Sequence, residues 1–356
     1  MSNRFEDRLT RLRAELAARG LNAFYVSGEP NVAYFTGKKG NDCALYVTQN
    51  DAVIITDFRY REMAQSLTWL EYYEIGIGRS VFDFINSRFE KKIGIEKDRI
   101  RLSLALSFKE KCPSKEFVPE EDIVLALREV KDEYEIEATK AACSIAMLAF
   151  DHMCEFLRPG LTEREAAAEL EYFMRKNGAE ELSFDTILIT GAKTSLPHGV
   201  PGDDVIKKGD FVTMDYGCKV GGYCSDETRT VAIGQPSQEM IDVYNIVLEA
   251  QQNACDKIHA GLTGRECDAF ARDVIEKAGY GEYFGHSLGH GTGLEIHESP
   301  RYAQTNNEPI KAGTIVSIEP GIYLPGKFGV RIEDLALVTE TGIINFVTAP
   351  KELIIL

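Results

Sequence analysis

The chain has 356 residues, of which 44% are hydrophobic, and its 40 basic and 56 acidic side chains give a net charge of −16. This length exceeds the usual size of one domain, so we expect two domains. The negative charge repels phosphates, and no run approaches the ~18 apolar residues that cross a bilayer, so we predict neither nucleic acid nor a membrane as a partner.

The N-terminal stretch and the cysteines indicate the compartment. MSNRFEDRLTRLRAELAARG is charged throughout and has no apolar core, so we do not expect a signal peptide. The eight cysteines are scattered and form no CxxC pair. This usage favours free thiols over disulfides or a zinc knuckle, and we predict a cytoplasmic protein.

The first third of the chain has the pattern of an α/β domain. A first helix is predicted from apolar residues at helical spacing, which are Phe5, Leu9, Leu12 and Leu16. Short β-rich runs separated by turn residues predict strands at 23–26, 32–35, 43–48, 52–56 and 93–96. A further helix is expected from about Ser103. Residues 112–122 contain two prolines among charged side chains, and we interpret them as a linker between domains 1–122 and 123–356.

The second predicted domain contains an internal repeat. GLTERE at 160–165 recurs as GLTGRE at 261–266, and each copy begins a helix with a threonine cap. KKGDFVTMD at 207–215 likewise recurs as KAGTIVSIE at 311–319. A histidine lies between the two motifs in each copy, at His198 and His297. We therefore predict two copies of one half-domain about a pseudo-twofold axis.

Each copy supplies two carboxylates, one at the end of a strand and one after the following turn. They are Asp215 and Asp226 in the first copy and Glu319 and Glu333 in the second. A single acid of this kind would be interpreted as a solvent-exposed residue at the end of a strand, without a role in metal binding. Four at matching places favour a metal site, because a carboxylate beside an apolar strand is costly unless it is paired or metal-bound. His290 in the second copy aligns with Gly191 in the first and adds one imidazole.

Four carboxylates and one imidazole suit Mn²⁺, Fe²⁺ or Co²⁺ better than structural zinc. Because four close negative charges cannot all stay ionised alone, we predict two divalent metal ions, which would acidify a water into a nucleophile. Mn²⁺ is the preferred ion, and Co²⁺, Fe²⁺ and Zn²⁺ are alternatives. The spacing of His286 and His290 is that of a helical zinc pair, but the glycines around them argue against a helix. His152 and His259 have no companion ligands and are interpreted as ordinary histidines.

Five motifs together resemble the signature of the pita-bread metallopeptidases, over about residues 128–356: MDYG, YCSDETRTV, GHGTGLEIHESP, SIEPGIY and GVRIEDLALVT. This family includes methionine aminopeptidase, aminopeptidase P, prolidase and the metal-free creatinase. The preceding residues resemble a creatinase-like N-terminal domain through their strand order and phrases such as NVAYFTG. The resemblance implies an α/β two-domain fold, in which a smaller creatinase-like α/β domain precedes a pita-bread α+β domain.

The resemblance also implies which residues bind metal. Asp215 would hold one metal bidentately, and Asp226 and Glu333 would bridge both metals. His290 and Glu319 would complete the shell of the other metal, and Glu319 would also take a proton from the nucleophilic water.

Further residues match positions around the family's metals. His198 and His297 match two histidines that contact substrate and stabilise the tetrahedral intermediate, and His286 matches a further pocket histidine. Arg331 matches an arginine that orients a bridging carboxylate. Glu227 stands where many members have methionine, and we interpret it as a tolerated surface change.

The resemblance favours a Xaa-Pro peptidase over other members. Methionine aminopeptidase usually lacks an N-terminal domain of this size, and creatinase lacks the ligand set. Prolidase, which cleaves Xaa-Pro dipeptides, is the favoured prediction, and aminopeptidase P, which acts on longer Xaa-Pro peptides, is the alternative. A non-catalytic binding module of the same fold is a remote alternative, because such members have typically lost ligands. By analogy with the family we expect a homodimer.

Overall fold

The computed structural model describes residues 4–121 and 123–356, which fall into two compact units, Met1–Arg128 and Glu129–Leu356. Each unit has its own hydrophobic core, as expected for a chain of this length. Within the described residues, no helix combines the length and the apolar character needed to span a membrane. The predicted domain limits, at residues 122 and 123, stay a prediction.

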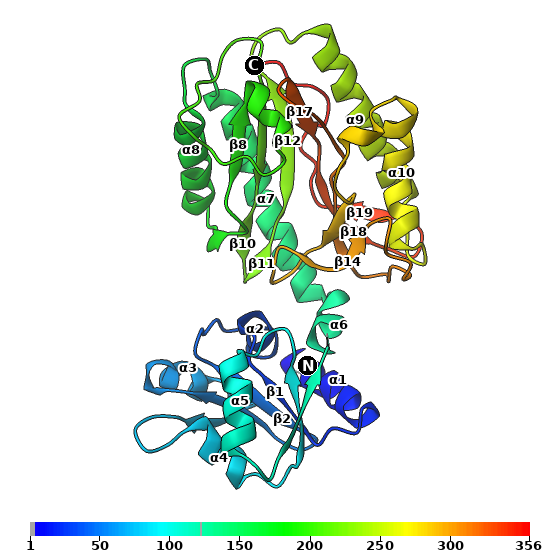
Figure 1. Cartoon of the computed structure of the whole chain (residues 1–356). Helices are drawn as coiled ribbons and strands as arrows, with labels where there is room; N and C mark the ends of the chain where they lie inside the picture. The colour runs from blue at the N-terminus through cyan, green and yellow to red at the C-terminus, as the bar shows by residue number, and fades with distance from the viewer. Residues whose placement is uncertain (1–3, 122) are drawn as a thin grey trace. The chain divides into compact units, whose positions relative to one another are not determined.

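The first unit is an α/β sheet flanked by helices (Figure 1). Its six strands lie in the order β4-β3-β2-β1-β5-β6, with mixed parallel and antiparallel pairing. The strands are β1 (Ala23–Val26), β2 (Ala44–Thr48), β3 (Ala52–Thr56), β4 (Glu71–Glu74), β5 (Lys92–Glu96) and β6 (Glu116–Glu120). The helices are α1 (Arg4–Ala18), α2 (Glu29–Thr36), α3 (Arg61–Ser66), α4 (Val81–Ser87), α5 (Leu102–Lys111) and α6 (Ile123–Glu129). The predicted first helix, four of the five predicted strands and the helix from about Ser103 are confirmed.

Residues 32–35 are helical, so the strand predicted there was wrong. They belong to α2, which starts with Pro30 in its first turn and ends at Gly37 with a left-handed φ of 67°. The β-branched and aromatic composition of VAYF suggested a strand. Pro30 at the start and Gly37 at the end instead favour a short helix. Residues 116–120, inside the stretch interpreted as a linker, form β6 and pair in parallel with β5. Pro119 is tolerated because β6 is an edge strand.

The second unit contains the predicted repeat. Its helices are α7 (Glu133–Phe156), α8 (Glu163–Lys176), α9 (Gln238–Lys257) and α10 (Gly264–Lys277). The first copy contributes strands β7 (Glu181–Leu182), β8 (Ile187–Thr190), β9 (Phe211–Tyr216), β10 (Cys218–Val220), β11 (Tyr223–Cys224) and β12 (Glu227–Ala232). The second contributes β13 (Gly289–Gly291), β14 (Glu298–Tyr302), β15 (Ile315–Ile318), β16 (Gly321–Leu324), β17 (Phe328–Arg331) and β18 (Asp334–Val338), and β19 (Ile343–Asn345) follows.

The helices of each copy pack on the strands of the same copy. α7 and α8 contact each other and the strands β8 and β10, whereas α9 and α10 contact each other and the strands β14–β17. Figure 1 shows the green and the yellow-to-red halves of this unit with their strands on the inside and α8 and α10 on opposite outer sides. The strands β9–β12 and β15–β18 therefore lie between two helical layers. Their ends are where the predicted carboxylates are found.

Candidate metal centre

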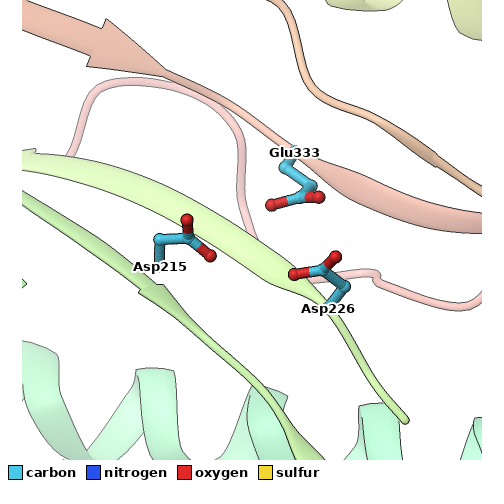
Figure 2. Close-up of side chains that lie close together, drawn as sticks. All are labelled: Asp215, Asp226 and Glu333. Carbon is cyan, nitrogen blue, oxygen red and sulfur yellow. The ribbon is translucent and has the colours of Figure 1, made fainter. Parts of the chain in front are cut away.

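Three of the predicted ligands come together at the ends of the inner strands. Asp215 is the fifth residue of β9, and Asp226 and Glu333 directly precede β12 and β18. The three residues each offer a carboxylate oxygen, and these oxygens lie within 4.8 Å of one another. Figure 2 shows the three carboxyl groups turned towards one shared space. The antiparallel pairing of β9 with β12 brings the two aspartates together from residues eleven apart in the chain, and the backbone bond from Glu333 N to Thr228 O brings in the third acid.

The other two predicted ligands border this cluster. His290 lies in β13, and its Nε2 is 3.6 Å from Asp226 Oδ2 and 3.4 Å from Glu319 Oε1. Its Nδ1 is 3.0 Å from the carbonyl oxygen of Gly291, so Nδ1 carries the proton and Nε2 presents a lone pair to the carboxylates. Glu319 Oε1 also accepts a hydrogen bond from Ser317 Oγ at 3.1 Å. All five residues that the sequence predicted as ligands thus lie in one cluster.

The cluster is buried and rich in negative charge. Asp226 and Glu333 are 4% and 1% exposed, and burial, reinforced by the neighbouring carboxylates, raises both pKa values well above their usual range. Burial likewise raises the pKa of Glu319 to about 7. Burial and nearby His297 lower the pKa of His290 to about 4, so its imidazole is neutral at pH 7. In this environment the anionic acids need additional positive charge nearby.

Arg331 supplies one positive charge and connects several site residues. Its Nη2 donates to Asp215 Oδ2 at 2.6 Å, and its Nε donates to Thr228 Oγ1 at 3.1 Å. The Thr228 hydroxyl in turn donates to Glu333 Oε2 at 2.6 Å. The arginine was predicted to orient a bridging carboxylate. It contacts Asp215 directly and reaches Glu333 only through Thr228.

His286 is connected to the same arginine through a tyrosine. Arg331 Nη1 donates to the Tyr323 hydroxyl at 2.8 Å, and that hydroxyl lies 2.9 Å from His286 Nε2. His286 Nδ1 faces the carbonyl oxygen of Ser287 at 2.8 Å, so Nε2 accepts the hydroxyl proton. Burial lowers the pKa of His286 to about 4. The sequence prediction missed Tyr323 and Thr228, although both stand in the motifs that carried the resemblance.

The two predicted substrate histidines lie at the exposed side of the cluster. The imidazoles of His297 and His290 are in edge contact, with ring centroids 4.4 Å apart. Burial, then Arg301 and His198, lowers the pKa of His297, and His198 also contributes to the lowered pKa of His286. His198 follows Pro197, whose carbonyl lies 3.5 Å from Arg331 Nη1, and both His198 and His297 are exposed to solvent. The structure brings all nine predicted site residues into one region.

Glu227 is buried, so its interpretation as a surface change was wrong. It is 0% exposed and pairs with Tyr216 in the β9–β12 register. Because side chains alternate along a strand, it points away from the site, towards the core. Among the described residues, no hydrogen bond reaches either carboxylate oxygen, although the Arg229 guanidinium and the Tyr216 hydroxyl, which donates to Ala146 O at 3.3 Å, both favour the charged form of Glu227. Burial raises the pKa of Glu227 to about 7.

The residues present fit divalent metal ions. Asp215 Oδ1 is buried, and in the described part of the chain it has no hydrogen-bond partner, which leaves a lone pair for a cation. Hard oxygen donors with one imidazole nitrogen are the ligands that Mn²⁺, Fe²⁺ and Co²⁺ accept. Cations would also offset the mutual repulsion of the acids that is evident in their raised pKa values.

The fold and this cluster of acids and imidazole define a two-domain metallopeptidase. The model of metallopeptidase family M24 matches residues 137–340, and that of the creatinase/prolidase N-terminal domain matches residues 8–130. The chain belongs to metallopeptidase family M24. It is therefore an enzyme, with a creatinase-type first domain, a pita-bread second domain and divalent metal ions as cofactors, typically two in this family.

Several relatives that match along the whole chain are named for their action on Xaa-Pro bonds. A Xaa-Pro dipeptidase of Pyrococcus furiosus is 38% identical and matches over 98% of this chain and 100% of its own. The structure of a Xaa-Pro dipeptidase from Bacillus anthracis has a TM-score of 0.95 at 42% identity, and the match covers 99% of this chain and 100% of that one. The structure of an X-Pro aminopeptidase from Thermotoga maritima has a TM-score of 0.91 at 39% identity, with 98% and 99% covered.

Proposed function

We propose that this chain is a dinuclear-metal hydrolase that cleaves the N-terminal Xaa-Pro bond of dipeptides or short peptides, with dipeptides favoured. The observation that carries the proposal is the cluster of four acids and one imidazole, all present in a chain whose full-length relatives are named for Xaa-Pro cleavage. Aminopeptidase P action on longer peptides is the second candidate, because one similar structure is an X-Pro aminopeptidase.

The metals would be held by the predicted ligands, which are Asp215, Asp226, His290, Glu319 and Glu333. When bound, two divalent cations supply Lewis acidity and lower the pKa of a water molecule. Glu319 is the residue we assign to accept the proton of the attacking water. Its side chain is 18% exposed, more than that of Asp226, so it can reach a water molecule beside the metals.

Two histidines would act on the substrate rather than on the metals. His198 and His297 are exposed beside the acids, so their N–H groups can donate to charge that develops on the attacked carbonyl or the departing nitrogen. His286 would lie in the substrate pocket, with its tautomer fixed by Ser287 and Tyr323. Arg331 would orient Asp215 without touching substrate.

The proposal has four finer parts. Mn²⁺ is the preferred metal, with Co²⁺, Fe²⁺ and Zn²⁺ as alternatives that elemental analysis of the purified protein distinguishes. The chain forms a homodimer, as the family resemblance suggests, and light scattering of the purified protein measures this. The first domain comprises residues 1–122 and the catalytic domain residues 123–356. The protein is cytoplasmic, a location that the eight free cysteines support.

The test compares one Xaa-Pro dipeptide with the Xaa-Pro-Xaa tripeptide that extends it, and each with its alanine counterpart. We expect cleavage of the dipeptide at the greater kcat/KM, and a loss of at least about tenfold when alanine replaces proline, which corresponds to about 1.4 kcal/mol. Preference for the tripeptide would move the chain to aminopeptidase P. Efficient cleavage of Met-Ala peptides with Xaa-Pro left intact would refute the proposal. No hydrolysis by protein shown to hold two metals would favour the non-catalytic binding module.

A further inference from the structure

The segment that carries His198 is anchored at both ends by one buried carboxylate. Glu163, the first residue of α8, is 0% exposed. Its Oε1 accepts a hydrogen bond from the backbone N–H of Thr190 at 2.8 Å, and its Oε2 accepts one from the backbone N–H of Gly202 at 2.8 Å. A single side chain therefore joins the beginning and the end of residues 190–202, which we call the His198 segment.

A lysine inside the segment completes the anchor. Lys193 Nζ donates to Glu163 Oε2 at 2.5 Å and to Asp204 Oδ2 at 3.1 Å. The backbone adds two further bonds, from Glu163 N to Asp204 O and from Arg164 N to Gly202 O, each at 3.0 Å. All three groups that donate to the Glu163 carboxylate, among the described residues, thus belong to the His198 segment. An amide in its place would turn an N–H group towards these donors.

The residues around His198 are largely open to solvent, whereas Thr194 and Ser195 earlier in the segment are buried, and Gly329 N donates to Thr194 Oγ1 at 2.8 Å. Leu196 and Val200, two residues either side of His198, are 53% and 75% exposed. The carbonyl of Pro197 accepts from Arg331 Nη1 at 3.5 Å, a distance at the limit for a hydrogen bond. The position of the His198 imidazole therefore depends on how firmly the chain is held on either side of it, and on the Gly202 side Glu163 supplies that hold.

The second copy of the half-domain has a different residue at the position of Glu163. There the threonine cap, Thr263, is followed by Gly264, and an added Cβ would lie 2.2 Å from the carbonyl oxygen of Arg301. Helix α10 nevertheless forms with the same capping box as α8. The repeated scaffold therefore does not require a carboxylate here, and the anchor belongs to the His198 segment alone.

We propose that Glu163 is a positioning residue that holds the His198 segment in the conformation that presents His198 to the substrate. The inference rests on the proposed catalytic role of His198, which it deepens. If this is correct, a substitution of Glu163 lowers kcat only when the His198 imidazole is present. The same substitution loosens the His198 segment whether or not the imidazole is present.

The test is a double-mutant cycle on the metal-loaded, full-length enzyme. Glu163→Gln and the control Glu165→Gln are each made in the wild type and in His198→Ala. Glu165 lies on the same helix, and its carboxylate bonds only Thr162 of the capping box among the contacts of the described residues. The readouts are kcat and KM on a Xaa-Pro dipeptide, metal per chain, and amide hydrogen exchange of residues 191–201.

We expect Glu163→Gln to lower kcat about tenfold or more, because small misplacement of a catalytic group is costly. Amide exchange in the His198 segment should also rise in Glu163→Gln. Glu165→Gln should change neither kcat nor amide exchange, and both variants should retain their metals. In the His198→Ala background, Glu163→Gln should change kcat by no more than about twofold. A change of that size lies within the usual scatter of such measurements, so the two substitutions would be non-additive. If Glu163→Gln does not fold, Lys193→Met removes one of the three donors and should give smaller changes in the same direction.

Two outcomes overturn the inference. The first is unchanged exchange in the His198 segment, and the second is an equal loss of kcat in both backgrounds. A His198→Ala protein that turns over at the wild-type rate would instead refute the proposed role of His198. The exchange data would then still show whether Glu163 anchors the segment, so the two failures remain distinguishable.

Discussion

The two copies of the half-domain in the second unit share a scaffold but differ in the residues that carry chemistry. Helices α8 and α10 each have 14 residues and a threonine capping box. A single bridge pairs Thr162 with Val205 in the first copy and Thr263 with Pro309 in the second. The helices, caps and bridges are thus repeated closely. The site itself is asymmetric, so the repeat supplies a frame within which each copy has its own task.

The histidine ligand illustrates this asymmetry. His290 in β13 aligns with Gly191, which has a left-handed φ of 58° and, with an added Cβ, would approach Asp210 Oδ1 to 3.3 Å. A histidine in the first copy would therefore be strained. The duplicated frame brings carboxylates from both copies, but only the second copy has backbone suited to an imidazole.

A second asymmetry concerns the acid that follows a predicted ligand in each copy. Glu227 follows Asp226 and has no hydrogen-bond partner among the described residues. Asp334 follows Glu333 and is just as buried, yet its Oδ1 accepts from Arg229, and Lys351 and Gln251 contact its Oδ2. Arg229 and the other partners hold the pKa of Asp334 below its usual value despite burial. Equivalent positions thus contain one carboxyl group that accepts several hydrogen bonds and one that, among the described residues, accepts none.

The largest effect is expected from removing the nitrogen that only the second copy supplies. His290→Ala should lose metal. Its kcat should fall by more than the factor of about 10²–10³ that is typical of losing one hydrogen-bond donor. Metal per chain and kcat on a Xaa-Pro dipeptide are measured together, with His259→Ala as the control. His259 is part-buried with its Nδ1 against Ala260 O, outside the cluster. If His290→Ala keeps two metals and full turnover, the asymmetry between the copies has no role in metal binding.

Asp334→Asn should strongly destabilise the protein. The neutral amide leaves the buried Arg229 guanidinium and the part-buried Lys351 ammonium without the carboxylate that pairs with both, and breaking a buried pair in this way costs about 3–5 kcal/mol. The free energy of unfolding is measured in urea. The exposed pair of Lys327 and Glu239 is the control, and Glu239→Gln there should cost at most about 1 kcal/mol. A loss in Asp334→Asn as small as that in Glu239→Gln would show that the partners of Asp334 contribute no more to stability than an exposed ion pair does.

Many helices and strands of the second unit were predictable from the sequence because the same motifs occur in both copies of the half-domain. The threonine caps and the acid-tipped strands stand at nearly constant offsets, and the structure confirms the helices and strands they predict. The surroundings of the acids were not predictable in this way. Whether Glu227 faces solvent or core depends on its register with Tyr216, and the environment of Asp334 includes Arg229, which lies 105 residues earlier in the chain. These are long-range contacts, which local patterns do not encode.

His198 and His297 test whether equivalent positions in the two copies have equivalent roles. His198→Ala and His297→Ala should each lower kcat by about 10²–10³-fold, because each removes one donor to developing charge. Both variants should retain their metals, unlike His290→Ala. Elemental analysis and kcat on the same dipeptide separate the possibilities. Loss of metal from His198→Ala would mean that the wrong histidine was assigned to the coordination shell, and wild-type turnover would mean that it is an ordinary loop histidine.

The smallest effect, and one of opposite sign, is expected at Glu227, which accepts no hydrogen bond from the described residues. Glu227→Met should raise the free energy of unfolding by about 1–3 kcal/mol, because it removes a buried polar group without a partner and leaves a side chain of similar size in the core. Urea unfolding of the metal-loaded protein measures the change, with metal per chain as the check that neighbouring Asp226 is undisturbed. Glu227→Gln is the matched control, since an amide there is neutral but still lacks partners, and its gain should be smaller. A loss of stability in Glu227→Met, with metals retained, would mean that the carboxyl is compensated as fully as Asp334. The contrast between the two copies at this position would then disappear.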